Sequence, residues 1–163
     1  MAKNKWRCWL SLFLFYACGG TSIYQTSTSL EHSQWPASSV LDFSFQVGDE
    51  SQDYDIYLLV KNSQDYPYQN LYVTYYLEDA THNLLHKELK NYALFDIKTG
   101  KPLGTGWRKS KRHEFLLTTG YQFSQSGSYT LKLVHFMRTD HLPGLQTIGM
   151  KVTPSKLHPD ETS

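Results

Sequence analysis

Apolar and polar side chains alternate along short segments of this chain, and this pattern restricts its fold more than any other feature. In DFSFQV, residues 42–47, every second side chain is apolar, and the same period of two runs through YDIYLLVKN, residues 54–62. Successive side chains of a β-strand point to opposite faces, so each segment predicts a strand with one buried face. The pattern therefore favours β structure built around a core.

Segments with strand character recur along most of the chain and are separated by short turn-like sequences. They are residues 40–47, 54–62, 70–79, 81–96, 112–123, 128–138 and 145–153. The connections between them are short and rich in Gly, Pro, Asp and Ser, as hairpins require. The sequence shows no crossover helices of the kind that a parallel α/β sheet needs. We therefore predict an all-β fold, an antiparallel β-sandwich of about seven strands.

One of these segments, THNLLHKELKNYALFD at residues 81–96, fits two secondary structures. Leu84, Leu85 and Leu89 could line one face of a helix, but the segment has no convincing N-cap. The alternation around Leu94 is typical of a strand, and a lone helix among strands would need a layer to cover. We predict a strand here.

Residues 1–17 are typical of an export signal. Three basic residues precede a run of nine residues, Trp9 to Ala17, that is mostly apolar. This run is far shorter than the roughly 20 apolar residues that a membrane-spanning helix needs. Cys18 follows the small Ala17 and precedes two glycines, an arrangement that resembles the lipobox of bacterial lipoproteins, in which this cysteine carries lipid. A plain secretory signal with an incidental thiol is the alternative.

The cysteine count and the charge balance narrow the class of protein. Cleavage after Ala17 would remove Cys8 and leave Cys18 as the single cysteine, so no internal disulfide could form. Lipid on Cys18 would hold the chain on a membrane, since each buried methylene contributes about 0.8 kcal/mol.

The remaining 146 residues suit one domain and carry 13 Lys and Arg against 15 Asp and Glu. A nucleic-acid partner would require a strongly basic face, so we expect none.

Composition divides the chain into four predicted parts. A signal peptide at 1–17 precedes a flexible, lipid-anchored tether at 18–39, which is rich in Ser and Thr and has scattered apolar residues. The β-sandwich domain spans 40–153. A polar tail with two prolines follows at 154–163.

Two groups of residues are candidates for an interaction surface. The first is a basic cluster that could dock against anionic lipid headgroups or an acidic partner, although most such runs are solvated loops. Its members are Arg108, Lys109, Lys111 and Arg112. The second is an aromatic set that could stack on sugars, although ordinary strand burial favours a place in the core or at its rim. Its members are Tyr66, Tyr68, Tyr72, Tyr76 and Trp107.

Signatures of catalysis and of metal binding are weak. The sequence lacks a G-x-S-x-G nucleophile motif, and GTGWRKS lacks the spacing of a phosphate-binding loop. His82 and His86 would converge on a helix, but on a strand they would lie about 13 Å apart. We therefore expect no enzyme, no metal site and no small-molecule substrate.

Longer blocks of the sequence resemble one known family. DYPYQNLYV, KPLGTG and SGSYTLKLVHFMRTDHLPGLQTIGMKV occur in this order after DFSF and YDIYLLVKN, and the most specific part is MRTDHLPGLQTIG, residues 137–149. From about Asp42 to Val152 the chain resembles the gliding-motility lipoprotein GldH family of the Bacteroidetes. Within the most specific block we also predict that Arg138 pairs with Asp140 to fix the turn before Pro143.

The resemblance implies an outer-membrane lipoprotein without enzymatic activity. It implies a diacylglycerol and an N-acyl chain such as palmitate on Cys18, no other cofactor, and partners among the gliding and type IX secretion proteins of the envelope. Surface lipoproteins of this phylum usually carry acidic residues directly after the cysteine, whereas Gly-Gly-Thr-Ser here predicts the periplasmic face. The alternative is a carbohydrate-binding lipoprotein with an exposed aromatic platform of Tyr66, Tyr68 and Trp107.

Overall fold

The computed structural model describes residues 23–107 and 109–155, which form a domain made almost entirely of strands. The strands are β1 (Tyr24–Ser29), β2 (Gln34–Pro36), β3 (Leu41–Val47), β4 (Asp53–Ser63), β5 (Asn70–Asp79), β6 (Leu84–Ala93), β7 (Ser110–Gln122), β8 (Gly127–His135), β9 (His141–Pro143) and β10 (Leu145–Pro154), and a short 3-10 helix, η1, spans Glu31–Ser33. No helix within these described ranges has the length and apolar character needed to cross a bilayer.

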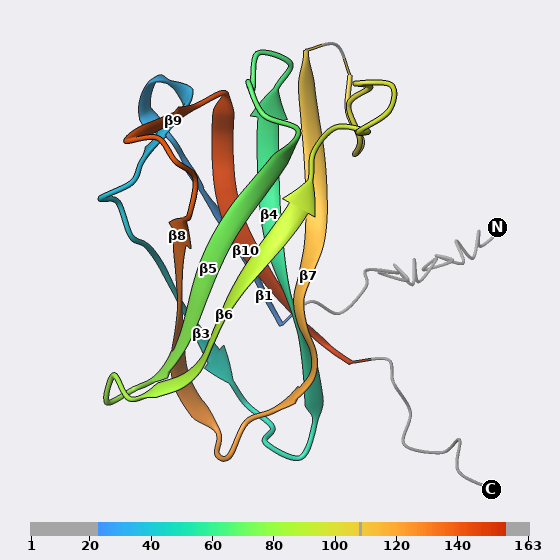
Figure 1. Cartoon of the computed structure of the whole chain (residues 1–163). Coiled ribbons are helices and arrows are strands. Elements are labelled where there is room, and N and C mark those ends of the chain that lie inside the picture. The colour runs from blue at the N-terminus through green and yellow to red at the C-terminus, as the bar shows by residue number, and fades with distance from the viewer. Residues whose placement is uncertain (1–22, 108, 156–163) are drawn as a thin grey trace, which may run out of the picture.

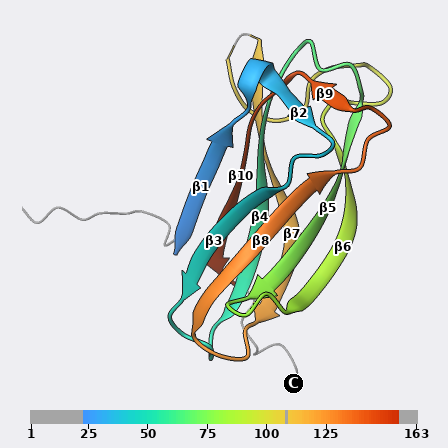
Figure 2. The same cartoon turned by 90° about the vertical axis from the view of Figure 1, so that its left-hand side faces the viewer.

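Two four-stranded antiparallel sheets pack face to face (Figures 1 and 2). The β4 sheet has the strand order β1-β10-β4-β7, and the β5 sheet has the order β3-β8-β5-β6. Strands β2 and β9 pair separately. The predicted antiparallel sandwich is confirmed, with each of the seven predicted strands present. The ambiguous segment 81–96 contains β6, so its prediction as a strand is also confirmed.

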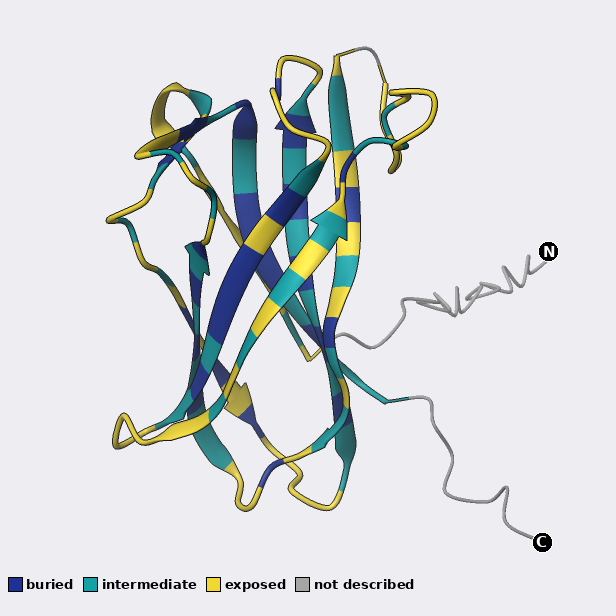
Figure 3. Cartoon of the chain, in the orientation of Figure 1, coloured by how far each residue is buried: buried dark blue, intermediate teal, exposed yellow. Residues whose placement is uncertain are grey.

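The core lies between the two sheets and follows the alternation of the sequence. Every second residue of β4 from Tyr54 to Val60 is buried, and Figure 3 shows buried and partly exposed positions alternating along this strand. Toward one end of the sandwich, Phe123 packs against Tyr54 with ring centroids 5.6 Å apart and against Tyr129 at 4.4 Å. Aromatic pairs add about 0.5–1.5 kcal/mol beyond the area they bury. The sequence contains 12 tyrosines, and four of them are buried in this core, namely Tyr54, Tyr66, Tyr75 and Tyr129.

The fold begins at Tyr24, so the prediction of a flexible tether over residues 18–39 is wrong for most of that range. β1 pairs with β10 along its whole length, from Tyr24 opposite Val152 to Ser29 opposite Thr147. An edge strand can pair its backbone while its Ser and Thr side chains remain in water, which is why composition alone indicated a spacer. The signal peptide predicted at 1–17 lies outside the described residues, as does the stretch 18–22.

Trp35 fixes the rest of this N-terminal segment to the core. Its side chain is fully buried, its Nε1–H donates to the Ser39 carbonyl at 3.0 Å, and its ring packs edge-on against His135 with centroids 5.5 Å apart. At the other end of the domain, the Ser155 N–H donates to the Asp53 carbonyl at 2.7 Å. The domain therefore begins well before the predicted residue 40, at Tyr24, and ends just after the predicted residue 153. Residues 156–163 lie outside the described part.

The two ends of the sandwich differ in the length of their connections (Figure 1). At the tight-turn end the connections are 48–52, 80–83 and 123–126, and at the long-loop end they are 30–40, 64–69, 94–109 and 136–144. The Ile23 N–H donates to the Val152 carbonyl at 3.1 Å, and Val152 pairs with Ile56, near the start of β4. The described chain therefore enters the sandwich in the half nearer the tight-turn end.

Acidic residues organise the tight turns. The Asp79 carboxylate accepts hydrogen bonds from the Thr81 hydroxyl at 2.7 Å and from the Asn83 N–H at 2.9 Å, and these bonds lower the pKa of Asp79 to about 2. Asp49 accepts from the Ser51 hydroxyl in the same way, which lowers its pKa. These carboxylates therefore serve the turns in which they lie.

Candidate functional site

Exposed aromatic and apolar side chains gather near the long-loop end, on the outer face of the β5 sheet. They surround an open hollow of about 430 Å³, which we call the aromatic hollow. Its lining residues are Tyr68, Tyr72, Leu89, Phe136, Met137 and Arg138. They come from the β4–β5 loop, from β5 and β6, and from the segment after β8, so segments distant in the sequence build the site together.

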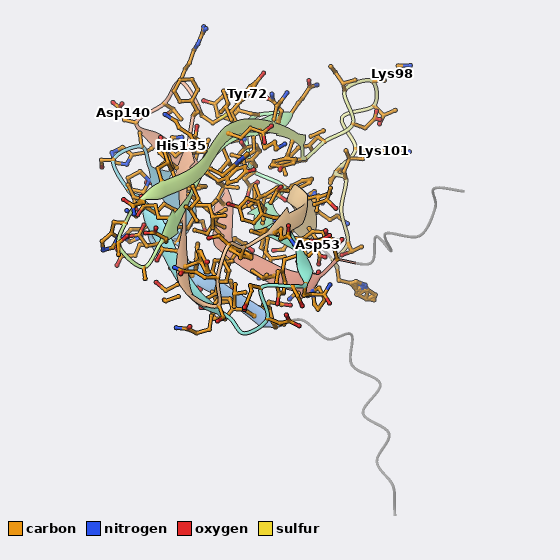
Figure 4. The ribbon with its side chains drawn as sticks, turned by 90° about the horizontal axis from the view of Figure 1, so that it is seen from below. Asp53, Tyr72, Lys98, Lys101, His135 and Asp140 are labelled. Atoms are coloured by element: carbon orange, nitrogen blue, oxygen red, sulfur yellow. The ribbon has the colours of Figure 1, made fainter. Side chains whose placement is uncertain are left out.

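Strand geometry turns these side chains outward. Leu71 and Val73 of β5 point into the core, so Tyr72 between them points to solvent, and Figure 4 shows it at the outer surface, above the buried His135. The Phe136 N–H donates to the Tyr72 carbonyl at 2.8 Å and continues the pairing of β8 with β5. The Phe136 ring remains 68% exposed. The ring of Tyr72 thus lies on the sheet and Phe136 directly continues its pairing, whereas Tyr68 comes from the β4–β5 loop.

The charged groups at this face are mostly cationic. Arg138 lines the hollow, and no described carboxylate forms an ion pair with it. Lys87 lies over the ring of Tyr76, 5.1 Å from its centroid. Lys132 is neutralised by Glu78, with Nζ and Oε2 2.8 Å apart. The described lining of the aromatic hollow is therefore apolar and aromatic, with the single charge of Arg138.

The predicted pair between Arg138 and Asp140 is wrong, because the two side chains form no ion pair in the described chain. Gly144 fixes the turn instead. Its φ is +83°, its N–H donates to the Ser33 carbonyl at 2.8 Å, and its carbonyl accepts from the Ser63 N–H at 2.8 Å. A Cβ on Gly144 would lie 2.6 Å from the Cα of Tyr66. The distinctive block 137–149 therefore contains a glycine that three other segments surround.

The predicted aromatic platform does not form as a unit. Tyr66 is 4% exposed, its hydroxyl donates to the Asn70 carbonyl at 2.8 Å, and burial raises its pKa, so it belongs to the core. Trp107 is 79% exposed but lies on the loop 94–109 and does not line the hollow. Tyr68 does line it, together with Tyr72. Sequence reasoning missed Phe136, although an apolar residue on the outward register of β8 was a signal for it.

The predicted basic cluster does not form one surface either. Lys109 is exposed, whereas the Lys111 Nζ donates to the Gly106 carbonyl at 3.1 Å. Strand alternation turns Arg112 away from Lys111, onto the outer face of the β4 sheet opposite Lys61. Arg108 lies outside the described residues, and so does Cys18, the predicted site of lipid attachment.

The histidines do not converge. His82 lies in the β5–β6 turn, 3.5 Å from Glu78, whereas His86 on β6 stacks on Tyr75 with ring centroids 5.4 Å apart. Within residues 23–107 and 109–155, no group of three or more His, Cys, Asp or Glu side chains could hold a metal ion.

Two other histidines are buried. The His113 Nε2 lies 2.9 Å from the Asn62 Oδ1, and burial, reinforced by the charge of Lys111, lowers the pKa of His113. Burial also lowers the pKa of His135, whose Nδ1 accepts from the Met137 N–H at 3.3 Å. Both side chains are therefore structural groups held in the neutral form.

The fold and these surfaces define a β-sandwich domain that presents exposed aromatic and cationic groups near one end. A sequence model of the family described as GldH lipoprotein matches residues 22–152, so the chain belongs to the GldH lipoprotein family. The resemblance seen in the sequence blocks is thereby confirmed. A protein of Christiangramia forsetii named gliding motility lipoprotein GldH homolog is 22% identical over 154 residues, which cover 89% of this chain and 91% of the relative.

Solved structures show weaker likeness. A family GH115 4-O-methyl-alpha-glucuronidase matches with a TM-score of 0.44 and 14% identity over 81% of this chain and 18% of its own. The Gt strain of infectious bursal disease virus matches with a TM-score of 0.38 and 15% identity over 83% of this chain and 32% of its own. This chain thus spans under a third of either structure.

Proposed function

We propose that this chain is an outer-membrane lipoprotein that contributes a non-catalytic interaction surface to the gliding-motility and type IX secretion-associated machinery of the envelope. Its membership of the GldH lipoprotein family and the name of its relative support a lipoprotein associated with gliding motility. In this proposal residues 1–17 are a cleaved signal peptide, Cys18 carries diacylglycerol and an N-acyl chain, and the domain lies on the periplasmic face.

The aromatic hollow is the observation that carries the proposed interaction surface. Large apolar side chains with exposed fractions of 37–68% lie together there, namely Tyr68, Tyr72, Leu89 and Phe136. Burying apolar surface stabilises a complex by about 25 cal/mol per Å², and exposed apolar patches typically mark interaction sites. The charge of Arg138 favours a protein partner with a carboxylate next to its apolar side chains.

Two substitutions in the hollow test this surface. Phe136→Ala combined with Arg138→Ala should leave the melting temperature unchanged, because both side chains are exposed, but should abolish the recovery of envelope partners after mild detergent extraction. Ile97→Ala is the matched control, since Ile97 is 76% exposed on the loop 94–109 and lies outside the hollow. Unchanged partner recovery with the hollow variant would contradict the proposed surface.

Deletion of the gene tests the cellular role. Surface spreading and secretion should be assayed separately in the deletion strain. Loss of both would favour a role in secretion, and loss of spreading alone would favour a role in motility. Normal spreading and normal secretion would contradict the proposed function.

Carbohydrate binding is a second candidate, because Tyr68 and Tyr72 are 38% and 37% exposed and line the same hollow. Sugars stack on exposed rings of this kind. Titration of the full chain with envelope polysaccharide should show binding that Tyr72→Ala weakens at least tenfold. Binding that is equally strong in this variant would place any sugar site elsewhere.

A further inference from the structure

Two cationic residues lie directly opposite each other on the outer face of the β4 sheet. Lys61 of β4 and Arg112 of β7 are register partners. Directly paired residues of antiparallel strands have Cα atoms about 4.5–5.5 Å apart, and like charges at such positions repel. No ion pair to a carboxylate of the described chain involves either side chain. The folded chain therefore retains a repulsion that its own residues do not compensate.

Polar side chains continue this pair into a row across the sheet. Thr147 of β10 is the register partner of Lys61 on the other side. Thr105 is joined to Arg112 by two backbone hydrogen bonds, of 2.9 and 2.7 Å. All four residues line an open hollow of about 330 Å³, which we call the cationic hollow, and Gln25 also lines it.

One carboxylate, that of Glu114, also lines the cationic hollow. The ammonium group of Lys151 bonds to it, and the same ammonium lies 4.7 Å from the centroid of the Tyr57 ring. Glu114 is therefore neutralised by a cation outside the hollow, and the charges of Lys61 and Arg112 remain.

We propose that the cationic hollow binds a phosphate group between Lys61 and Arg112. A guanidinium offers paired N–H donors that match two phosphate oxygens, and an ammonium adds a second charge from the neighbouring strand. The hydroxyls of Thr105 and Thr147 can donate to the remaining oxygens. Bound phosphate would replace the repulsion between the two cations by attraction to both.

The phosphate could belong to a lipid headgroup or to a soluble phosphate ester, and both present the same chemistry. The lipid source rests on the lipid anchor of the proposed function. Gln25, at the edge of the hollow, is seven residues after Cys18. Ser29, which pairs with Thr147 beside Lys61, is eleven residues after Cys18, so an extended chain places the phosphate position within about 40 Å of the anchoring sulfur. A headgroup of the same bilayer is then within reach.

Thermal unfolding of the full chain in inorganic phosphate and in chloride at equal ionic strength tests the site. Phosphate should raise the melting temperature by several degrees, because a ligand that binds only the folded state stabilises it. Lys61→Glu should melt higher than the unaltered chain in chloride, since the new carboxylate pairs with Arg112, and should lose the shift specific to phosphate. No shift in the unaltered chain, or an equal shift in Lys61→Glu, would overturn the proposal.

Lys98→Glu is the matched control, because it makes the same change of charge on the exposed loop 94–109, outside the cationic hollow. It should keep the phosphate shift of the unaltered chain, which also accounts for the general stabilising effect of phosphate on folded proteins. A loss of the shift in Lys98→Glu equal to that in Lys61→Glu would show that net charge, and no specific site, is responsible.

The lipidated chain in nanodiscs distinguishes the two sources. With phosphatidylglycerol, amide exchange at residues 105 and 111–114 should be slower than in micelles of dodecyl maltoside, which carries no phosphate, and Lys61→Glu should remove the difference. Equal exchange in the lipid and in the detergent, with the phosphate shift present, would assign the site to a soluble phosphate ester. The unfolding experiment in inorganic phosphate does not depend on the lipid anchor. Its failure would therefore overturn this phosphate site without contradicting the proposed function.

Discussion

At the scale of single residues, Gly144 joins two other segments of the long-loop end through its backbone hydrogen bonds to Ser33 and Ser63. Gly144→Ala would introduce a Cβ 2.6 Å from the Cα of Tyr66, at a φ of +83°. Left-handed strain and overpacking each contribute about 1–3 kcal/mol, so we expect the free energy of unfolding to fall by about 3 kcal/mol or more. Gly120→Ala is the control, because Gly120 has a φ of +60° and an added Cβ there would meet no atom within 4 Å. Equal losses in urea titrations of the two variants would contradict the close packing of Gly144.

The buried histidines predict how stability depends on pH. Burial lowers the pKa of His113 and of His135 below the usual 6.5, so the unfolded chain binds protons that the folded chain excludes. The two neutral histidines make their full contribution to the free energy of unfolding above about pH 6.5. This contribution decreases as the pH falls from 6.5 toward their lowered pKa values. Urea unfolding at pH 7.5 and 5.5 should show this loss, and His135→Gln should reduce it. A loss of the same size in the variant would contradict the assignment to His135.

At the scale of elements, β2 is the segment whose role differs most from its sequence prediction. Trp35→Ala should lower the free energy of unfolding by about 3–5 kcal/mol, because Trp35 is fully buried. Trp107→Ala should change it by no more than about 0.5 kcal/mol, since Trp107 is 79% exposed. Chemical unfolding measures both values. A small effect of Trp35→Ala would instead support the flexible tether that the composition predicts for this segment.

The strands could be predicted where one face of the strand is strictly apolar. That pattern holds for β3 and β4, whereas β1, with the sequence YQTSTS, shows little of it because its outward side chains are polar and only Tyr24 packs against the core. β2 and β9 have three residues each, too few for a period to be recognised. Their pairing depends on Trp35 and Leu142 meeting across 107 positions of sequence, which no local pattern contains.

The candidate sites could be predicted only in part, because their residues meet through register. The aromatic hollow combines Tyr72 of β5 with Phe136, which directly follows β8, and the cationic hollow combines Lys61 of β4 with Arg112 of β7. Sequence neighbours grouped Arg112 with Lys111 instead, and strand alternation separates those two. Tyr66 is buried by contacts with residues that are distant in the sequence, around Gly144. The local sequence therefore does not distinguish it from the exposed Tyr68.

At the scale of the whole molecule, the sequence has few residues between Cys18, the proposed site of lipid attachment, and the start of the described domain. Ile23 is five residues after Cys18, which an extended chain spans in about 18 Å. Inserting 20 Gly and Ser residues after Gly20 should leave the melting temperature unchanged, since the insertion precedes Tyr24. It should reduce surface spreading if the long-loop end must meet its partner at a fixed height above the bilayer. Full spreading with the insertion would contradict such a fixed height.

The entry of the chain through β1 also determines how the domain would bear a mechanical load. β1 runs from Tyr24 toward the long-loop end, and its six residues pair with β10 (Figure 2). A pull between an anchor upstream of Ile23 and a partner at the opposite end would act along this strand. Backbone hydrogen bonds lie across the strand direction, so the pull would shear them all at once and could not unzip them one after another. With the proposed anchor at Cys18, a load would therefore reach the sandwich as shear along β1.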